Sequence, residues 1–260
     1  MRYEINGTVM QTVAIALSPG ESVFAQTHGM AWMTRAIEMD THTGGGMWAG
    51  LKRAMGGGSF FITDYSAAGG SGEVGFAPRF PGTIIAKELR AGESLICRKE
   101  TFLCAERGVS LEIVLQQRLG AGFFAGEGFI LQKVSGPGTV FLDLSGEVIE
   151  KTLAPGETLR VHAGHIGMQE PSVSTDIQMV RGFRNMIFGG EGLFLATLTG
   201  PGKVWLQSMP VMNLAEEIAR YLPGEKAVDA GAGAGIGRMV GGGAAGAALG
   251  GILGGILGSE

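Results

Sequence analysis

His162 and His165 are the side chains in this chain best suited to hold a metal ion or move a proton. Imidazole is a common metal ligand and titrates near neutral pH. On a β-strand, however, a spacing of three residues places the two rings on opposite faces, and no nearby carboxylate or thiol completes a ligand set. We therefore predict no metal site, no catalytic residue and no cofactor site, and we interpret both histidines as turn residues that face water.

The two cysteines, Cys97 and Cys104, also have residue types capable of chemistry. The sequence around them predicts a hairpin that turns at Lys99-Glu100, which makes the two sulfur atoms diagonal neighbours on paired strands. A diagonal pair does not form a disulfide. We expect both thiols to be buried and reduced.

Carboxylates are plentiful, but their pattern assigns no acid or base role. Asp143 and Glu147 straddle a predicted turn at Ser145-Gly146 and are expected to face solvent. No glycine run ends in the Lys-Ser/Thr of a phosphate loop, and no Gly-x-Ser-x-Gly elbow is present. We therefore expect the protein not to be an enzyme.

The elements that must position these residues are marked by a phrase that occurs three times. It is written as Leu17–Ser22, Leu89–Ser94 and Leu153–Thr158, with glycines at positions 20, 92 and 156, so the copies lie 72 and 64 residues apart. Self-similarity at a long period indicates one structural unit used several times. Within the phrase, Pro-Gly is typical of a type II turn, so we interpret Glu21, Glu93 and Glu157 as turn residues rather than catalytic ones.

Short alternating apolar runs separated by glycine and proline surround these turns and predict antiparallel strands. The predicted fold is all-β: three repeated antiparallel β-sandwich units in pseudo-threefold arrangement, forming one compact body, with a C-terminal helix and a Gly-rich tail. Asn213 and Glu216 are expected to cap the helix, and Pro223-Gly224 to end it. The approximate boundaries are 1–75, 76–140 and 141–210 for the units, 211–224 for the helix and 225–260 for the tail.

Composition limits the classes of partner. The formal net charge is −4 and no Lys/Arg-rich run exists, so nucleic-acid binding is not expected. The N-terminus lacks the basic start and apolar core of a secretory signal, and two cysteines suit a reducing compartment. We expect a cytoplasmic protein, with a location at the inner face of the membrane left open.

The tail leaves two interpretations open. Met239 to Gly258 is 20 residues without a charge, and glycines recur at every fourth position from Gly242 onward, as in a glycine zipper. A helix of this length would span about 30 Å and would present one smooth face for close helix pairing. Nine of the 20 residues are glycine, however, and each costs a helix about 1 kcal/mol relative to alanine. Membrane contact through Met239 to Gly258 and a disordered or self-associating tail both remain as expectations.

Two apolar segments bounded by glycine, Met47–Met55 and Val180–Phe188, each place bulky side chains beside two cations. Aromatic residues, Met and Arg are enriched at interfaces. These segments are therefore candidates for an oligomer interface, and a short helix that caps a sandwich explains them equally well.

Three phrases together resemble the bacterial branch of the altered inheritance of mitochondria family, also called mitochondrial biogenesis proteins. They are Gly136–Val140, Leu153–Glu157 and Gly190–Phe194. The resemblance covers about Tyr3 to Pro210. It implies three β-sandwich units like those of the tryptophan RNA-binding attenuation protein, and it implies no catalytic residues.

The repeat without a catalytic constellation favours a non-enzymatic oligomeric scaffold or interaction protein that self-associates, with membrane contact through the tail left open. The alternative is a small-molecule binding protein with a pocket between β units. A deep pocket with convergent polar side chains would favour the alternative.

Overall fold

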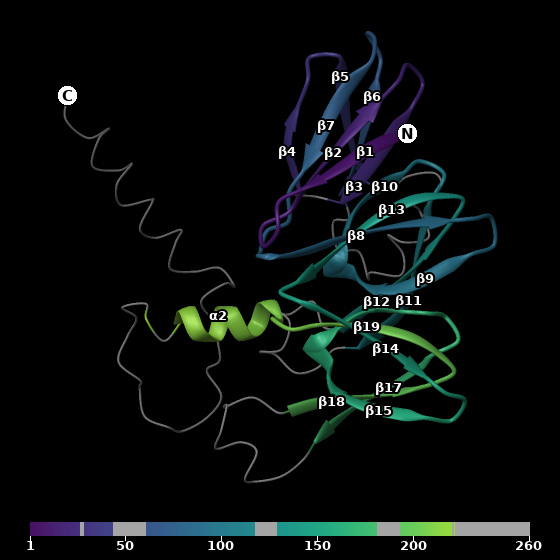
Figure 1. Ribbon diagram of the computed structural model, residues 1–260, viewed down its shortest axis with the longest axis vertical. Helices are drawn as coiled ribbons and strands as arrows, with labels where there is room; N and C mark the ends of the chain where they lie inside the picture. Colours follow the sequence, from purple (N-terminus) through teal and green to yellow (C-terminus); the bar gives the residue numbers. More distant parts are fainter. Residues whose placement is uncertain (27–28, 44–60, 118–128, 181–192, 220, 222–260) are drawn as a thin grey trace, which may run out of the picture.

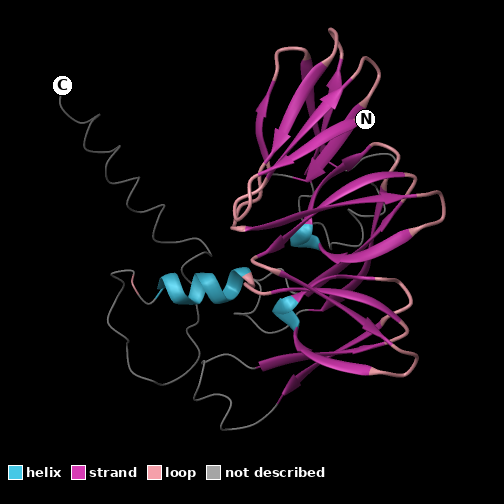
Figure 2. Ribbon diagram, in the orientation of Figure 1, coloured by secondary structure: helices cyan, strands magenta, loops and turns pink. Residues whose placement is uncertain are grey.

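The structure, a computed structural model, describes residues 1–26, 29–43, 61–117, 129–180, 193–219 and 221. This part of the chain is predominantly β-sheet, and its strands form four antiparallel sheets. Figure 1 and Figure 2 show the sheets stacked one above another along the long, vertical axis of the molecule.

The first sheet has four strands in the order β1-β2-β7-β4. Their bounds are β1 (Arg2–Asn6), β2 (Thr12–Leu17), β7 (Gly72–Phe76) and β4 (Met30–Met33). The second sheet has six strands in the order β5-β6-β3-β10-β13-β8. Their bounds are β5 (Ile37–Thr43), β6 (Phe61–Ala67), β3 (Ser22–Gln26), β10 (Phe102–Glu106), β13 (Gly138–Ser145) and β8 (Gly82–Leu89).

The third sheet has six strands in the order β11-β12-β9-β16-β19-β14. Their bounds are β11 (Ser110–Gln117), β12 (Phe129–Ser135), β9 (Ser94–Arg98), β16 (Ile166–Gln169), β19 (Gly202–Gln207) and β14 (Val148–Leu153). The fourth sheet has the order β15-β18-β17, with β15 (Thr158–His162), β18 (Leu193–Thr199) and β17 (Ser174–Val180).

Three clusters of buried apolar side chains fill the spaces between successive sheets. The first sheet buries only one of its faces, so burial alternates along β2: Val13 and Ile15 are buried, whereas Ala14 between them is only partly buried. The middle sheets are covered on both faces. In β13, Leu142 therefore packs toward the third sheet while Phe141 packs toward the first, and three consecutive apolar residues, Val140–Leu142, are buried.

The repeated Gly-Glu phrase forms the same turn three times. The glycines Gly20, Gly92 and Gly156 have φ of 89°, 88° and 78°, a conformation that L side chains rarely adopt. In each turn the glutamate amide donates to the carbonyl three residues earlier, at 2.9, 3.0 and 3.0 Å. The interpretation of the phrase as a turn is therefore confirmed.

The glutamate side chain of each turn also makes a structural hydrogen bond that was not predicted from the sequence. Its Oε2 accepts a hydrogen bond from the backbone amide three residues earlier. The donors are Ser18, Arg90 and Ala154, at 2.7, 2.8 and 2.8 Å. This bond satisfies an amide at the end of the preceding strand, and it explains why the residue after the glycine is glutamate in all three copies.

The predicted hairpin at Lys99-Glu100 is wrong, and the strands on either side of the predicted turn at Ser145-Gly146 do not pair with each other. Strands β9 and β10 follow each other in sequence but lie in different sheets, joined by a short 3-10 helix, η2 (Lys99–Thr101). Likewise β13 pairs with β8 and β10, whereas β14 pairs with β19. Consecutive strands cross between layers here because each finds its partner in a strand distant in sequence.

One α-helix follows the sheets in the described part of the chain: α2 (Val211–Ala219). It begins directly after Pro210, whose carbonyl accepts from the amides of Asn213 and Leu214 at 3.0 and 3.4 Å. Asn213 therefore lies inside the helix, and its predicted role as the cap is wrong. No helix among the described residues is both long enough and apolar enough to cross a membrane.

Candidate interaction surface

The two histidines lie side by side, not on opposite faces of a strand. Strand β15 ends at His162, and the next three residues form a 3-10 helix, η4 (Ala163–His165). This turn brings the two ring centroids to 5.8 Å in an edge-to-face arrangement. The predicted orientation is wrong because the strand ends at the first of the two histidines.

The surroundings of His162 favour its neutral form. Burial lowers the pKa of His162 below its usual value of 6.5, and the positive charges of His165 and Arg98 lower it further. The Nδ1 of His165 lies 2.8 Å from the carbonyl oxygen of Gln207. Within the described ranges, no three His, Cys, Asp or Glu side chains are grouped to hold a metal ion.

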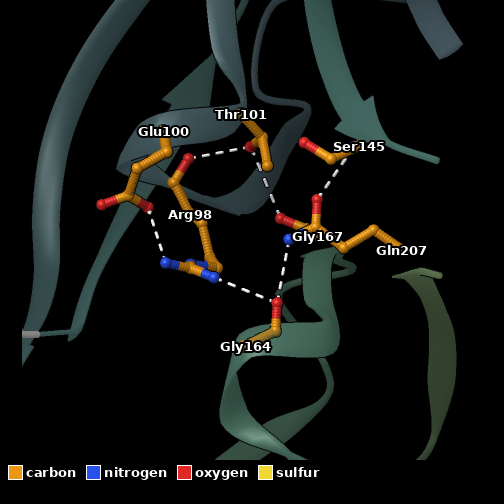
Figure 3. A network of polar contacts seen from close by, with 7 residues as sticks. All are labelled: Arg98, Glu100, Thr101, Ser145, Gly164, Gly167 and Gln207. Atoms are coloured by element: carbon orange, nitrogen blue, oxygen red, sulfur yellow. Dashed lines mark hydrogen bonds and ion pairs between the residues drawn. The ribbon is translucent and has the colours of Figure 1, made fainter. Parts of the chain in front are cut away.

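A buried polar network ties the end of β9 to the neighbouring strands (Figure 3). Arg98, which is 6% exposed, donates from Nη1 to the carbonyl of Gly164 at 3.1 Å and forms an ion pair with Glu100 at 3.1 Å. Gln207 donates to the same Gly164 carbonyl at 2.9 Å and accepts from the Ser145 amide at 3.0 Å. The Arg98 guanidinium therefore has a structural role, because it satisfies the buried Gly164 carbonyl where two sheets meet.

The two cysteines are free and buried, as predicted, although they lie in different sheets. Cys97 packs between the second and third sheets, and Cys104 between the first and second. Burial raises the pKa of Cys97 to about 12 and that of Cys104 well above its usual value of 9.0. Neither thiol is ionised near neutral pH, so neither is a nucleophile.

Asp143 was predicted to face solvent, but it is half-buried. It lies in β13 next to Leu142 and Leu144, which are both fully buried. Its Oδ1 is buried and has no hydrogen-bond partner among the described residues. Burial raises the pKa of Asp143 from 3.8 to about 7. By contrast, Glu147 in the following turn is exposed, as expected.

A small pocket lies near the N-terminus. It has a volume of about 110 Å³ and is lined in part by Arg2, Ser18 and Glu21. The Glu21 carboxylate also pairs with the terminal amine of Met1 at 3.1 Å. Pockets for metabolites usually measure about 300 Å³ or more, so this one holds few atoms beyond water.

The most distinctive surface of the described chain is the edge formed by β4. We define the β4 surface as Met30, Trp32 and Met33, which are 36%, 39% and 40% exposed. The register with β7 places Met30 and Met33 on the face of Phe76 and Val74, and Trp32 on the face of Gly75. Three partly exposed large apolar side chains within four residues of one edge strand mark an interaction site more often than isolated exposed residues do.

Local contacts hold Trp32 in place on this surface. Its Nε1 donates to Oε1 of Glu73 at 2.9 Å. A Cβ added at Gly75 would lie 2.1 Å from the indole, so the ring lies directly against the backbone of β7. Sequence reasoning missed this surface. The signal was available as the run Met-Ala-Trp-Met, which lacks the alternation expected of a strand with one buried face.

The edge itself is open among the described strands. Strand β4 pairs with β7 on one side, and no described strand pairs with its other side. Strand β15 at the opposite end of the stack likewise pairs only with β18. Figure 1 places β4 at the edge of the uppermost layer and β15 in the lowest layer.

Several sequence predictions concern residues outside the described part of the chain. They are the interface segments Met47–Met55 and Val180–Phe188, the latter apart from Val180, and the tail 225–260 with its glycine zipper.

Comparisons with known proteins agree with the resemblance noted from the sequence. A family model described as mitochondrial biogenesis AIM24 matches residues 3–209. An uncharacterized protein of Streptococcus pyogenes serotype M6 is 29% identical over 233 residues, which cover 86% of this chain and 92% of that protein. A crystal structure of a protein from Streptococcus pyogenes is 28% identical, with a TM-score of 0.69, and covers 85% of this chain and 99% of the other.

Proposed function

The chain belongs to the mitochondrial biogenesis AIM24 family, and from that premise we propose that it is a non-enzymatic scaffold that self-associates through its sheet edges. The observation that carries the proposal is the β4 surface. Exposed strand edges are sites where further chains add to a sheet, and soluble proteins usually protect them with charge, proline or a covering segment. Here the edge instead carries Met30, Trp32 and Met33.

The remaining candidate sites support a scaffold over an enzyme. The cysteines, Arg98 and the histidine pair are held by burial or by backbone contacts that serve the fold. The small-molecule alternative has weaker support because the pocket beside Glu21 is smaller than most metabolite sites.

We also propose that the body consists of three related units, β2–β7, β8–β13 and β14–β19, an arrangement like that of the tryptophan RNA-binding attenuation protein. Strand order supports the proposal: β2-β7-β4, β8-β13-β10 and β14-β19-β16 are equivalent runs, as are β5-β6-β3, β11-β12-β9 and β17-β18-β15. The three Gly-Glu turns occupy the same place in each run. Repeated units suit a scaffold, because each added unit extends the binding surface without new chemistry.

For the tail we propose a peripheral membrane contact at the inner face of the cytoplasmic membrane. The support is the uncharged run from Met239 to Gly258 and two buried, free thiols, which suit a reducing compartment. Flotation with liposomes tests this contact. The full chain should float, and a full chain with Leu253→Lys and Ile256→Lys should not. Equal flotation of both would contradict the membrane contact and leave the scaffold proposal standing.

Light scattering on the full chain tests the self-association. We expect an average mass above 27.0 kDa that rises with concentration. Trp32→Gln should lower the mass at a given concentration, because it removes the largest apolar side chain of the β4 surface. Met10→Gln is the control, since Met10 is 65% exposed and lies outside the strands and away from β4 in the sequence. A monomer of 27.0 kDa at every concentration would contradict the proposal.

A further inference from the structure

Two junctions inside the chain show how its strands join across units. In the second sheet β3 pairs with β10, and in the third sheet β9 pairs with β16. The registers match: Ala105 lies opposite Phe24, and Gln169 lies opposite Ile96. In both cases the strand that follows a Gly-Glu turn pairs with the strand that follows a short crossing to the next layer.

Strand β4 is the counterpart of β10 and β16. Each of the three pairs antiparallel with the strand beside it, and each pairing shifts register at the same point. The shifts lie between Met30 and Trp32, between Phe102 and Cys104, and between Ile166 and Met168. This alignment makes Met33 the counterpart of Ala105 and Gln169, and it makes Trp32 the counterpart of Cys104 and Met168.

A side-chain to backbone hydrogen bond at the end of each of the strands β4, β10 and β16 supports the same alignment. The side chains of Thr34, Glu106 and Glu170 each accept a hydrogen bond from an amide of the neighbouring strand segment. The donors are the amides of Glu73, Thr139 and Lys203.

Burial differs sharply between these counterparts. Met33 is 40% exposed, whereas Ala105 is 0% and Gln169 is 1% exposed. The inner strands are covered by β3 and β9, and no described strand covers β4. Strand β15 is the counterpart of β3 and β9, since it too follows a Gly-Glu turn, and its outer side is also open among the described strands.

We propose that β4 of one copy pairs antiparallel with β15 of a second copy, in the register of the two internal junctions. The proposal rests on the self-association proposed above and specifies how it occurs. In this register Met33 lies opposite Arg160 of the second copy, and Trp32 lies opposite Val161. The joined sheet has the order β17-β18-β15-β4-β7-β2-β1, which continues the pattern of the second and third sheets.

The side chains at this junction suit each other. Arg160 is exposed, and its aliphatic stem covers the Met33 side chain while its guanidinium stays in water. Because the two edges differ, the contact is head-to-tail, and it closes into a ring or continues as a filament according to the rotation between copies. Inside the assembly, the outer sides of both β4 and β15 are then paired.

Charge changes at the proposed cross-strand pair of Met33 and Arg160 test the register of β4 with β15. Met33→Arg places two cations opposite each other, and we expect the association constant to fall at least about tenfold. Met33→Glu faces the native Arg160 with the opposite charge and should associate as well as the wild type. The double variant Met33→Arg/Arg160→Glu restores the pair and should recover the association. Sedimentation velocity of the full chain measures all four proteins.

Two controls make the result specific. Met39→Arg introduces the same side chain on edge strand β5, where Met39 is 50% exposed, and should leave the mass unchanged. Lys151→Glu makes the same charge change as Arg160→Glu on edge strand β14, and it should not rescue Met33→Arg. If the wild type is oligomeric but Met33→Arg matches Met39→Arg, the junction is wrong and the scaffold proposal survives. A monomeric wild type overturns both.

Discussion

Asp143 is a carboxyl group whose environment opposes its ionisation. Burial raises its pKa from 3.8 to about 7. Between these values the folded chain holds a proton that the unfolded chain has lost, so the free energy of unfolding falls as pH rises from about 4 to about 7. Asp143→Asn removes this titration. At about pH 8 we expect the variant to be more stable than the wild type, by at most about 4 kcal/mol.

Urea denaturation at about pH 4.5 and about pH 8 measures this difference. The gap between variant and wild type should widen as pH rises. Glu147→Gln, an exposed carboxyl in the next turn, is the control and should show no such widening. An equal gap at both pH values would show that Asp143 ionises as readily in the fold as in the unfolded chain.

The two thiols provide a second residue-level prediction. Because the pKa of Cys97 is about 12 and that of Cys104 is also raised, thiolate is scarce near neutral pH. We expect less than about one part in a thousand of Cys97 to be ionised at pH 8. Ellman's reagent should therefore label neither cysteine in the folded chain, and it should label both in urea. Rapid labelling without denaturant would place a thiol at the surface.

At the scale of elements, the Gly-Glu turns are the features the sequence predicted best. Gly156 has φ of 78°, and nothing lies within 4 Å of an added Cβ, so the cost of a side chain there is conformational. Gly156→Ala should lower the free energy of unfolding by about 1–2 kcal/mol, and Gly156→Asn by less, because Asn tolerates this region. Thermal or urea unfolding measures the change.

Gly69→Ala is the matched control for this turn. An added Cβ at Gly69 also meets nothing within 4 Å, but its φ lies outside the left-handed region. We expect no comparable loss. Similar effects at both positions would mean that positive φ does not determine the cost at Gly156.

Strand pairing was harder to predict than the strands themselves. The apolar alternation in β2 and the turn residues at Gly92 are local signals, so they identify elements and their ends. The pairing of β9 with β16 instead depends on residues about 70 positions apart, and nothing in either strand encodes its partner. The hairpin assumption failed at Lys99 for that reason: a turn of three residues also fits a crossing between layers.

The candidate site shows the same division. The burial of Cys97 and Cys104 could be predicted from their apolar sequence neighbours. The raised pKa of Asp143 could not, because it depends on the layers that cover β13 from both sides. For the β4 surface, the non-alternating run from Met30 to Met33 was a signal in the sequence, but its apolar residues are equally typical of a core strand. Only the sheet order shows that no described strand covers them.

At the scale of the whole molecule, each middle sheet joins strands that are distant in sequence. Strand β3 pairs with β10 in the second sheet and β9 pairs with β16 in the third, so each of these strands has a neighbour on both sides. Strands β4 and β15 have a neighbour on one side alone among the described strands. In repeat proteins such ends are capped by polar residues or by further association, and the apolar β4 surface favours association.

A pair of charge-swapped chains provides the strongest test of that arrangement. One full chain carries Met33→Arg and keeps the native Arg160, so its own two ends repel. The other carries Met33→Glu together with Arg160→Glu, and its ends repel as well. Each should be monomeric alone by light scattering. An equimolar mixture should assemble into species larger than a monomer, because every junction then pairs an introduced charge with its opposite. If the mixture stays monomeric while the wild type assembles, β4 and β15 do not meet in this register.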